Sequence, residues 1–159
     1  MKIRNLIPII SSITFSLPAL ATGDSNCVDR TRDAASVRQA RERICELTNF
    51  ERRKREAPPL VLDVKRSKVA QAHAYDMYRR DYFSHTSPEG EEPDDRLQSA
   101  GIDWRTWGEN IARHPKGMPV DIESMWMNSS GHRRNILKKT FGRLGVGASY
   151  GYWVQVFTD

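Results

Sequence analysis

Apolar side chains recur at helical spacing through the first part of the chain. Intervals of three and four residues predict a helix over residues 35–55, which Pro58-Pro59 ends. A second apolar stripe predicts a helix up to about Arg80, with Asp63 as its N-cap. The apolar positions of the first helix are Val37, Ala40, Ile44 and Leu47.

Shorter helices are expected further along. Pro93 and Gly101 suit the start and the end of a third helix. A fourth helix follows residues 115–119, and Ser129-Ser130-Gly131 interrupts it before Ile136.

The pattern then changes to alternation. Leu144, Val146 and Ala148 point to one face, and residues 153–157 alternate in the same way after a Ser-Tyr-Gly turn, which predicts a β-hairpin. Residues 108–112 add a short strand. Helices first and strands later predict an α+β fold with a mostly antiparallel sheet.

Composition narrows the class of protein. With 159 residues, 38% hydrophobic and 28% charged, the chain suits one globular domain and is too short for two of ordinary size. The sequence contains no HExxH, GxxxxGK[ST] or GxSxG motif and no EF-hand loop, so several familiar enzyme classes are excluded.

The first 21 residues have the pattern of a secretory signal peptide. Lys2 and Arg4 precede an uncharged, mostly apolar stretch, and Ala19-Leu20-Ala21 is a cleavage pattern. The stretch is shorter than a bilayer span requires, so no permanent membrane anchor is expected. Cleavage after Ala21 predicts a secreted or periplasmic protein, with residues 22–34 as an N-terminal arm before a domain over 35–159.

Export permits a disulfide bond. Cys27 and Cys45 are the only cysteines, so they form the only possible pair within the chain. On a loop-entropy estimate the bond would contribute about 3 kcal/mol to stability.

Three residues carry the candidate chemistry. His85, Glu109 and His132 each lie where a helix or strand meets a Ser- or Gly-containing loop. Two imidazoles and a carboxylate would suit a divalent cation, zinc above all, with water as the fourth ligand. Their spacing alone is not a metal signature. The same residues would also suit a hydrolase with Glu109 as the general base and Ser129 or Ser130 as a nucleophile.

His73 lies on the apolar stripe of the second predicted helix. A single histidine there favours a hydrogen-bonded core residue over a ligand.

Four motifs resemble the bacterial branch of the CAP superfamily, which groups cysteine-rich secretory proteins, antigen 5 and plant pathogenesis-related proteins. They occur in the family's order between about Ala35 and Asp159. They are the stretches Tyr82 to Gly90 (YFSHTSPEG), Gly108 to Ala112 (GENIA), Trp126 to Leu137 (WMNSSGHRRNIL), and Gly145-Val146-Gly147 with the later Tyr152 to Phe157 (YWVQVF).

The resemblance implies an α-β-α sandwich with helices flanking a small sheet, and a cleft lined by histidine and glutamate. By motif, His85 matches the family's first His and Glu109 the Glu of Gly-Glu-Asn. Ser129 stands where the family has a second Glu. His132, in the bacterial Ser-Gly-His-Arg motif, is expected to bring a second imidazole to the cleft.

The resemblance also guides the functional hypothesis. Members of the family have been associated with sterol and lipid binding and with cell surfaces. We therefore expect an exported, monomeric, non-enzymatic binding module whose cleft takes a divalent cation or a small lipid-like ligand. Its partner would be a lipid, a cell-wall component or a protein, and nucleic acid is not expected. A hydrolase acting on peptide, ester or cell-wall material is the alternative.

Overall fold

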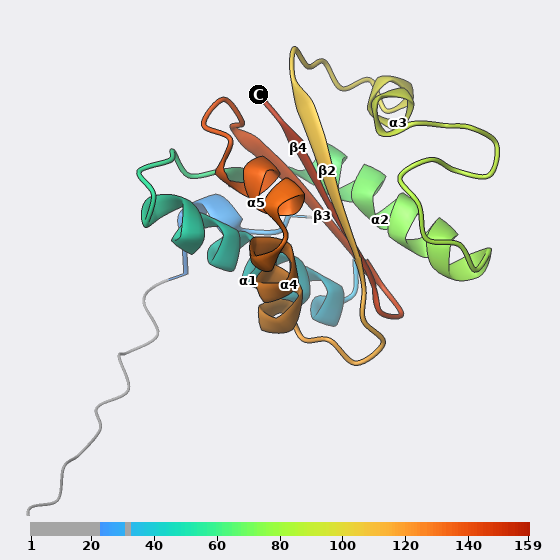
Figure 1. Cartoon of the computed structure of the whole chain (residues 1–159), viewed down its shortest axis with the longest axis horizontal. Helices are drawn as coiled ribbons and strands as arrows, with labels where there is room; N and C mark the ends of the chain where they lie inside the picture. Colours follow the sequence, from blue (N-terminus) through green and yellow to red (C-terminus); the bar gives the residue numbers. More distant parts are fainter. Residues whose placement is uncertain (1–22, 31–32) are drawn as a thin grey trace, which may run out of the picture.

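The computed structural model describes residues 23–30 and 33–159, so the expected signal peptide and its cleavage site lie outside the described part of the chain. Helices cover both faces of a central sheet (Figure 1). The helices are η1 (Ser25–Cys27), α1 (Ala35–Arg53), α2 (Val64–Arg79), α3 (Pro93–Ser99), α4 (Pro119–Asn128) and α5 (Ser130–Leu137). The strands are β1 (Val61–Leu62), β2 (Trp107–Arg113), β3 (Arg143–Ser149) and β4 (Tyr152–Thr158).

The sheet has the order β1-β3-β4-β2. The short β1 runs parallel to β3, and the other two pairings are antiparallel, which confirms the predicted α+β class and the mostly antiparallel sheet. The expected strand over 108–112 is β2, and it forms an edge of the sheet. Because successive side chains of a strand point to opposite faces, Glu109 and Asn110 of β2 face different helical layers.

Each face of the sheet has its own apolar core. On one face, α2 packs on β3 and β4, and α3 lies beside it (Figure 1). On the other face, α1, α4 and α5 enclose a core that contains Trp126, Phe141 and Phe157. The arrangement is the α-β-α sandwich that the motifs implied.

Two glycines let α2 lie very close to β3. A Cβ atom on Gly145 would lie 2.2 Å from the backbone of Arg66, and one on Gly147 would lie 2.3 Å from the backbone of Ala70. Real side chains do not tolerate such distances, so the Gly-Val-Gly motif is a packing requirement. Close packing of α2 fixes the segment that follows it, which carries His85.

The helix ends differ from the predictions by a few residues. α1 ends at Arg53, before the expected residue 55, because the backbone reverses at Glu56, whose φ is +54°, and the amide of Ala57 donates to the carbonyl of Arg52. The buried guanidinium of Arg52 donates to the carbonyl groups of Pro58, Ile136, Lys138 and Phe141. The interruption predicted at Ser129-Ser130-Gly131 is confined to Ser129, whose backbone is extended. Ser130 and Gly131 already belong to α5.

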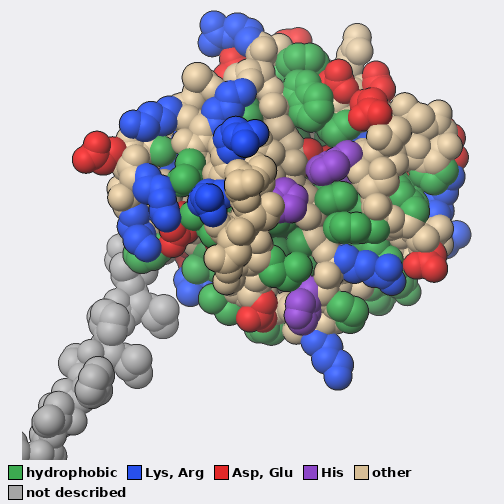
Figure 2. Space-filling view, viewed as in Figure 1, with side chains coloured by type: hydrophobic (Ala, Val, Ile, Leu, Met, Phe, Trp, Pro, Cys, Tyr) green, Lys and Arg blue, Asp and Glu red, His purple; other side chains and the backbone are tan. Residues whose placement is uncertain are grey.

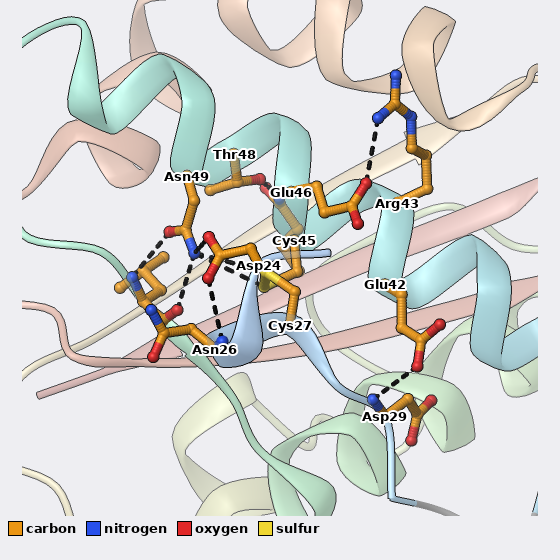
Figure 3. Close-up of a disulfide and its surroundings, with 12 residues drawn as sticks. Asp24, Asn26, Cys27, Asp29, Glu42, Arg43, Cys45, Glu46, Thr48 and Asn49 are labelled. Carbon is orange, nitrogen blue, oxygen red and sulfur yellow. Dashed lines mark hydrogen bonds and ion pairs between the residues drawn. A yellow bond between two sulfur atoms is a disulfide. The ribbon is translucent and has the colours of Figure 1, made fainter. Parts of the chain in front are cut away.

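The predicted disulfide bond joins Cys27 of η1 to Cys45 of α1 (Figure 3). Asp24, next to it, accepts hydrogen bonds from Asn26 and Asn49, and Asn49 also donates to the carbonyl of Leu60. The bond therefore fixes this part of the N-terminal arm to the domain. Among the described residues, no helix has the length and apolar character needed to cross a bilayer.

Candidate functional site

Glu109 lies at the centre of the site. It is on β2, its carboxylate is buried, and Arg96 of α3 donates a hydrogen bond from Nη2 to Oε2 over 3.0 Å. The same guanidinium donates to the carbonyl groups of Glu91 and His85, over 3.0 and 2.8 Å. Arg96 thus neutralises the buried carboxylate and also holds the segment between α2 and α3 against it.

His85 lies on that segment and contacts the other carboxylate oxygen. Its Nδ1 is 2.7 Å from Glu109 Oε1. A carboxylate paired with arginine accepts hydrogen bonds, so we assign the proton to Nδ1, which leaves the lone pair on Nε2. The side chain of His85 is 46% exposed, whereas that of Glu109 is 1% exposed. Glu109 therefore fixes the orientation of a ring whose outer edge is open to solvent.

His73 of α2 lies beneath this pair. Its Nε2 is 3.0 Å from the carbonyl oxygen of Ser84, to which it donates, and 3.9 Å from Glu109 Oε1. Burial lowers the pKa of His73, more strongly than the nearby carboxylate raises it. His73 is thus a buried, hydrogen-bonded residue, and it supports the loop that carries His85.

His132 reaches the site from the opposite helical layer, at the start of α5. Burial lowers its pKa, and a positive charge on His85, when that ring is protonated, lowers it further, so the two imidazoles lie within electrostatic range of each other. Asn110 donates to the backbone carbonyl of His132 over 3.1 Å, and Asn135 donates to Asn110. Figure 2 shows histidine side chains on this face, between α5 and the segment before α3.

The contacts of Asn110 continue through the core. Its amide also donates to Gln155 of β4, and Gln155 donates to Thr48 of α1 over 2.8 Å. Thr48 in turn donates to Oε2 of the buried Glu123 of α4 over 3.0 Å. This buried polar chain, from Asn110 to Glu123, connects the strand that carries Glu109 to the far helical layer.

The residues do not fit the three-ligand cation site expected from the sequence. Both oxygens of Glu109 already accept hydrogen bonds, one of them from a cation. Within residues 23–30 and 33–159, no group of three or more His, Cys, Asp or Glu side chains has a geometry that could hold a metal ion. A cation here would have only the two imidazoles as protein ligands, fewer than the three of a catalytic zinc site.

The hydrolytic alternative named Ser129 or Ser130 as a nucleophile beside a histidine. In the described part of the chain, no Ser, Thr or Cys side chain is hydrogen-bonded to the ring of His85 or His132. Ser129 instead separates α4 from α5. A general base on its own does not specify a reaction.

Arg96 is the residue of the site that the sequence analysis missed. It is the basic residue of a short helix that follows an acidic loop, and this pattern is typical of a solvent-exposed surface. Its position in the sequence gave one indication. Arg96 follows Pro93 by three residues, so in a helix the two lie on the same face, and this face, with Leu97, is buried.

Comparisons with known proteins find similar sequences and folds. The model of the cysteine-rich secretory protein (CAP) family matches residues 45–157. The chain is 43% identical to YkwD of Bacillus subtilis over 129 residues, which are 80% of this chain and 50% of YkwD. The chain thus spans half the length of that curated relative.

Solved structures show the same fold. A crystal structure of an extracellular protein with an SCP domain from Bacillus anthracis matches with a TM-score of 0.71 and 38% identity, over 74% of this chain and 39% of that one. A cysteine-rich secretory protein from Staphylococcus aureus matches with a TM-score of 0.68 and 18% identity, over 80% of this chain and 40% of that one.

Proposed function

Because the chain belongs to the cysteine-rich secretory protein (CAP) family, we propose that it is an exported binding module that holds a small ligand at His85 and His132, and not a conventional enzyme. The observation that carries this proposal is the half-exposed ring of His85, held from behind by the buried, arginine-paired Glu109. Such a ring presents one fixed hydrogen-bond acceptor to a ligand.

Three observations support export of the protein. The N-terminal pattern predicts a signal peptide, the chain has a disulfide bond, and the Bacillus anthracis relative is an extracellular protein. We propose secretion or release into a periplasm.

The ligand should carry a hydrogen-bond donor that approaches His85 Nε2. Near neutral pH, the lowered pKa of His132 keeps that ring uncharged, so it binds by hydrogen bonds and not as a cation. A hydroxyl or amide group of a lipid, a cell-wall fragment or a peptide meets this requirement.

The test is a nuclear magnetic resonance titration of the histidine ring signals with one probe from each class: a lysophospholipid, muramyl dipeptide and a short peptide. We expect one probe to move the signals of both His85 and His132. The same probe should have no effect on His132 in His85→Ala, and His114→Ala is the matched control because His114 is an exposed histidine elsewhere. If no probe moves either signal, the proposal is wrong.

Two further measurements distinguish the proposed binding module from a cation site and from a hydrolase. Zinc calorimetry above about pH 6.5 should give no stoichiometric binding. Stoichiometric binding that is lost in both His85→Ala and Glu109→Gln would favour the cation site. Hydrolysis of p-nitrophenyl acetate should equal that of the His114→Ala control, and turnover that disappears in Glu109→Gln would favour the hydrolase.

A further inference from the structure

Four aromatic side chains form an exposed surface beside the histidine site, which we call the aromatic platform. Its members are Tyr75 and Tyr78 of α2, Phe83 of the following segment, and Tyr150 of the β3–β4 turn. All four are exposed, and Phe83 stands two residues before His85. Figure 2 shows hydrophobic side chains next to a histidine on this part of the visible face, with basic and acidic side chains at their border.

Three of the exposed rings contact one another in a row, and a buried ring connects them to Phe83. Tyr150 stacks on Tyr78, with ring centroids 4.0 Å apart, and Tyr78 contacts Tyr75 at 6.4 Å. The buried Tyr152 lies below, 6.5 Å from Tyr78 and 6.4 Å from Phe83, and joins the two sides of the platform. The platform is therefore built on a rigid foundation of helix and sheet.

Tyr150 occupies its position at a conformational cost. Its φ angle is +47°, a left-handed value that a two-residue hairpin turn requires and that Asn or Gly adopts with less strain. Nevertheless the residue is 73% exposed, and its ring is stacked on Tyr78 and not buried in the core. An unfavourable backbone conformation that places a large ring in solvent indicates a binding role for the ring.

Polar groups of both signs border the rings. The guanidinium of Arg113 lies over Tyr152, 4.9 Å from the ring centroid, and 3.7 Å from the carboxylate of Asp81. At the other end, Arg80 forms ion pairs with Asp76 and Glu89. Carboxylates and guanidiniums that alternate around flat rings provide both acceptors and donors for hydroxyl groups.

This combination of groups distinguishes between possible partners. The guanidiniums of Arg80 and Arg113 are already paired with carboxylates, so they are not free to neutralise the phosphates of an anionic membrane or a nucleic acid. The exposed apolar area of the platform is aromatic, because the exposed aliphatic residues lie elsewhere in the described chain. They are Val28, Met118, Val120 and Met125.

We propose that the aromatic platform binds a saccharide chain. The C–H faces of a pyranose with equatorial hydroxyls are flat and weakly positive, so they pack on the negative faces of aromatic rings. The hydroxyls at the sugar's edge then meet the alternating carboxylates and guanidiniums. This surface is separate from the His85 and His132 site, and its role does not depend on the function proposed for that site.

The test uses the whole mature protein with its disulfide bond, and a hexamer of β-1,4-linked N-acetylglucosamine as the probe. Saturation-transfer nuclear magnetic resonance should show transfer to the ring C–H protons of the sugar. Replacing Tyr150 and Phe83 together, by Tyr150→Asn and Phe83→Ala, should weaken the affinity about tenfold or more. A cellohexaose titration shows whether the acetamido groups contribute.

Two controls separate loss of binding from loss of fold. Tyr150→Asn keeps a residue suited to a positive φ, so its melting temperature should equal or exceed that of the native chain while its affinity falls. Phe50→Ala removes an exposed ring from α1, on the opposite face of the sheet from α2, and should bind as the native chain does. His85→Ala should also retain saccharide binding, which keeps this test independent of the first.

Three results would overturn the proposal. The first is the absence of transfer to either hexamer at millimolar concentration. The second is unchanged affinity in the folded double variant. The third is self-association of the native chain that Tyr150→Asn abolishes, without saccharide binding, because the platform would then be an interface between two copies.

Discussion

The single side chain of Arg96 makes three hydrogen bonds that hold the site together. It pairs with the buried Glu109 and also holds the carbonyl groups of Glu91 and His85. A buried carboxylate without a cation is strongly unfavourable, so Glu109 depends on this arginine. The histidine loop is consequently fixed by a side chain of α3 and not only by its own backbone.

We predict that Arg96→Met lowers the free energy of unfolding by about 3–5 kcal/mol, because it leaves the charge of Glu109 buried and unpaired. Urea unfolding measures the change. Adding Glu109→Gln to this variant should recover part of the lost free energy, since the double variant has no buried carboxylate without a partner. Additive losses in the double variant would contradict the pairing.

Glu123 makes stability depend on pH. Burial raises the pKa of its carboxyl from 4.5 to about 8, against the opposing effect of Thr48. Between these values the folded protein keeps a proton that the unfolded chain releases. The stabilising contribution of this protonated group is therefore complete below pH 4.5 and is lost as the pH rises to about 8.

We predict that Glu123→Gln removes this pH dependence, because the amide keeps the size of the protonated acid and does not titrate. Urea unfolding at about pH 5 and about pH 9 should show the native chain losing stability relative to the variant. Glu46→Gln, on the surface of α1, is the control for the loss of one carboxylate. Equal slopes in the native chain and in Glu123→Gln would mean that Glu123 is ionised when folded.

Sequence motifs could identify His85 and Glu109, but not what surrounds them. Their contact was expected because both stand in motifs that the family shares. The place of Arg96 after Pro93 could indicate that its side chain turns inward, but not that it meets Glu109, because that contact depends on how α3 packs against β2. For the same reason, nothing in the sequence indicated that both oxygens of Glu109 accept hydrogen bonds.

At the scale of elements, the packing of α2 on β3 depends on the absence of two side chains. We predict that Gly147→Ala lowers the free energy of unfolding by about 3 kcal/mol, because the new Cβ would overlap the backbone of Ala70. Thermal and urea unfolding measure the loss. The matched control is Gly131→Ala in α5, which has no neighbour within 4 Å of the new Cβ and should stabilise by about 0.5 kcal/mol.

The elements themselves were largely predictable. Helical spacing indicated α1 and α2, Pro93 and Gly101 indicated α3, and apolar runs bounded by turn residues indicated β2 and the β3–β4 hairpin, although β4 is buried along its whole length. The strand β1 was not predicted, since it has two residues and no period of its own. β1 forms because it pairs with the free edge of β3, and pairing with a distant strand produces no pattern in the two residues themselves.

For the whole molecule, the disulfide bond fixes an arm that has little core of its own. We predict that the double variant Cys27→Ser/Cys45→Ser loses about 3 kcal/mol of stability, since the bond closes a loop over a sequence separation of 18. The melting temperature of the oxidised native chain, the reduced native chain and the variant tests this. Equal values for all three would show that the contacts of Asn49 hold the arm without the bond.

The position of β4 within the sheet sets the order in which the molecule can assemble. β4 lies between β2 and β3, yet it follows both in the sequence. During synthesis, β2 and β3 are therefore complete before the strand with which both of them pair. α2 is likewise complete before the strands on which it packs. The disulfide bond lies within the first 45 residues and needs none of these strands. In a chain that emerges from a membrane N-terminus first, the disulfide bond could therefore form early, and the sheet would be completed last, when β4 pairs with β2 and β3.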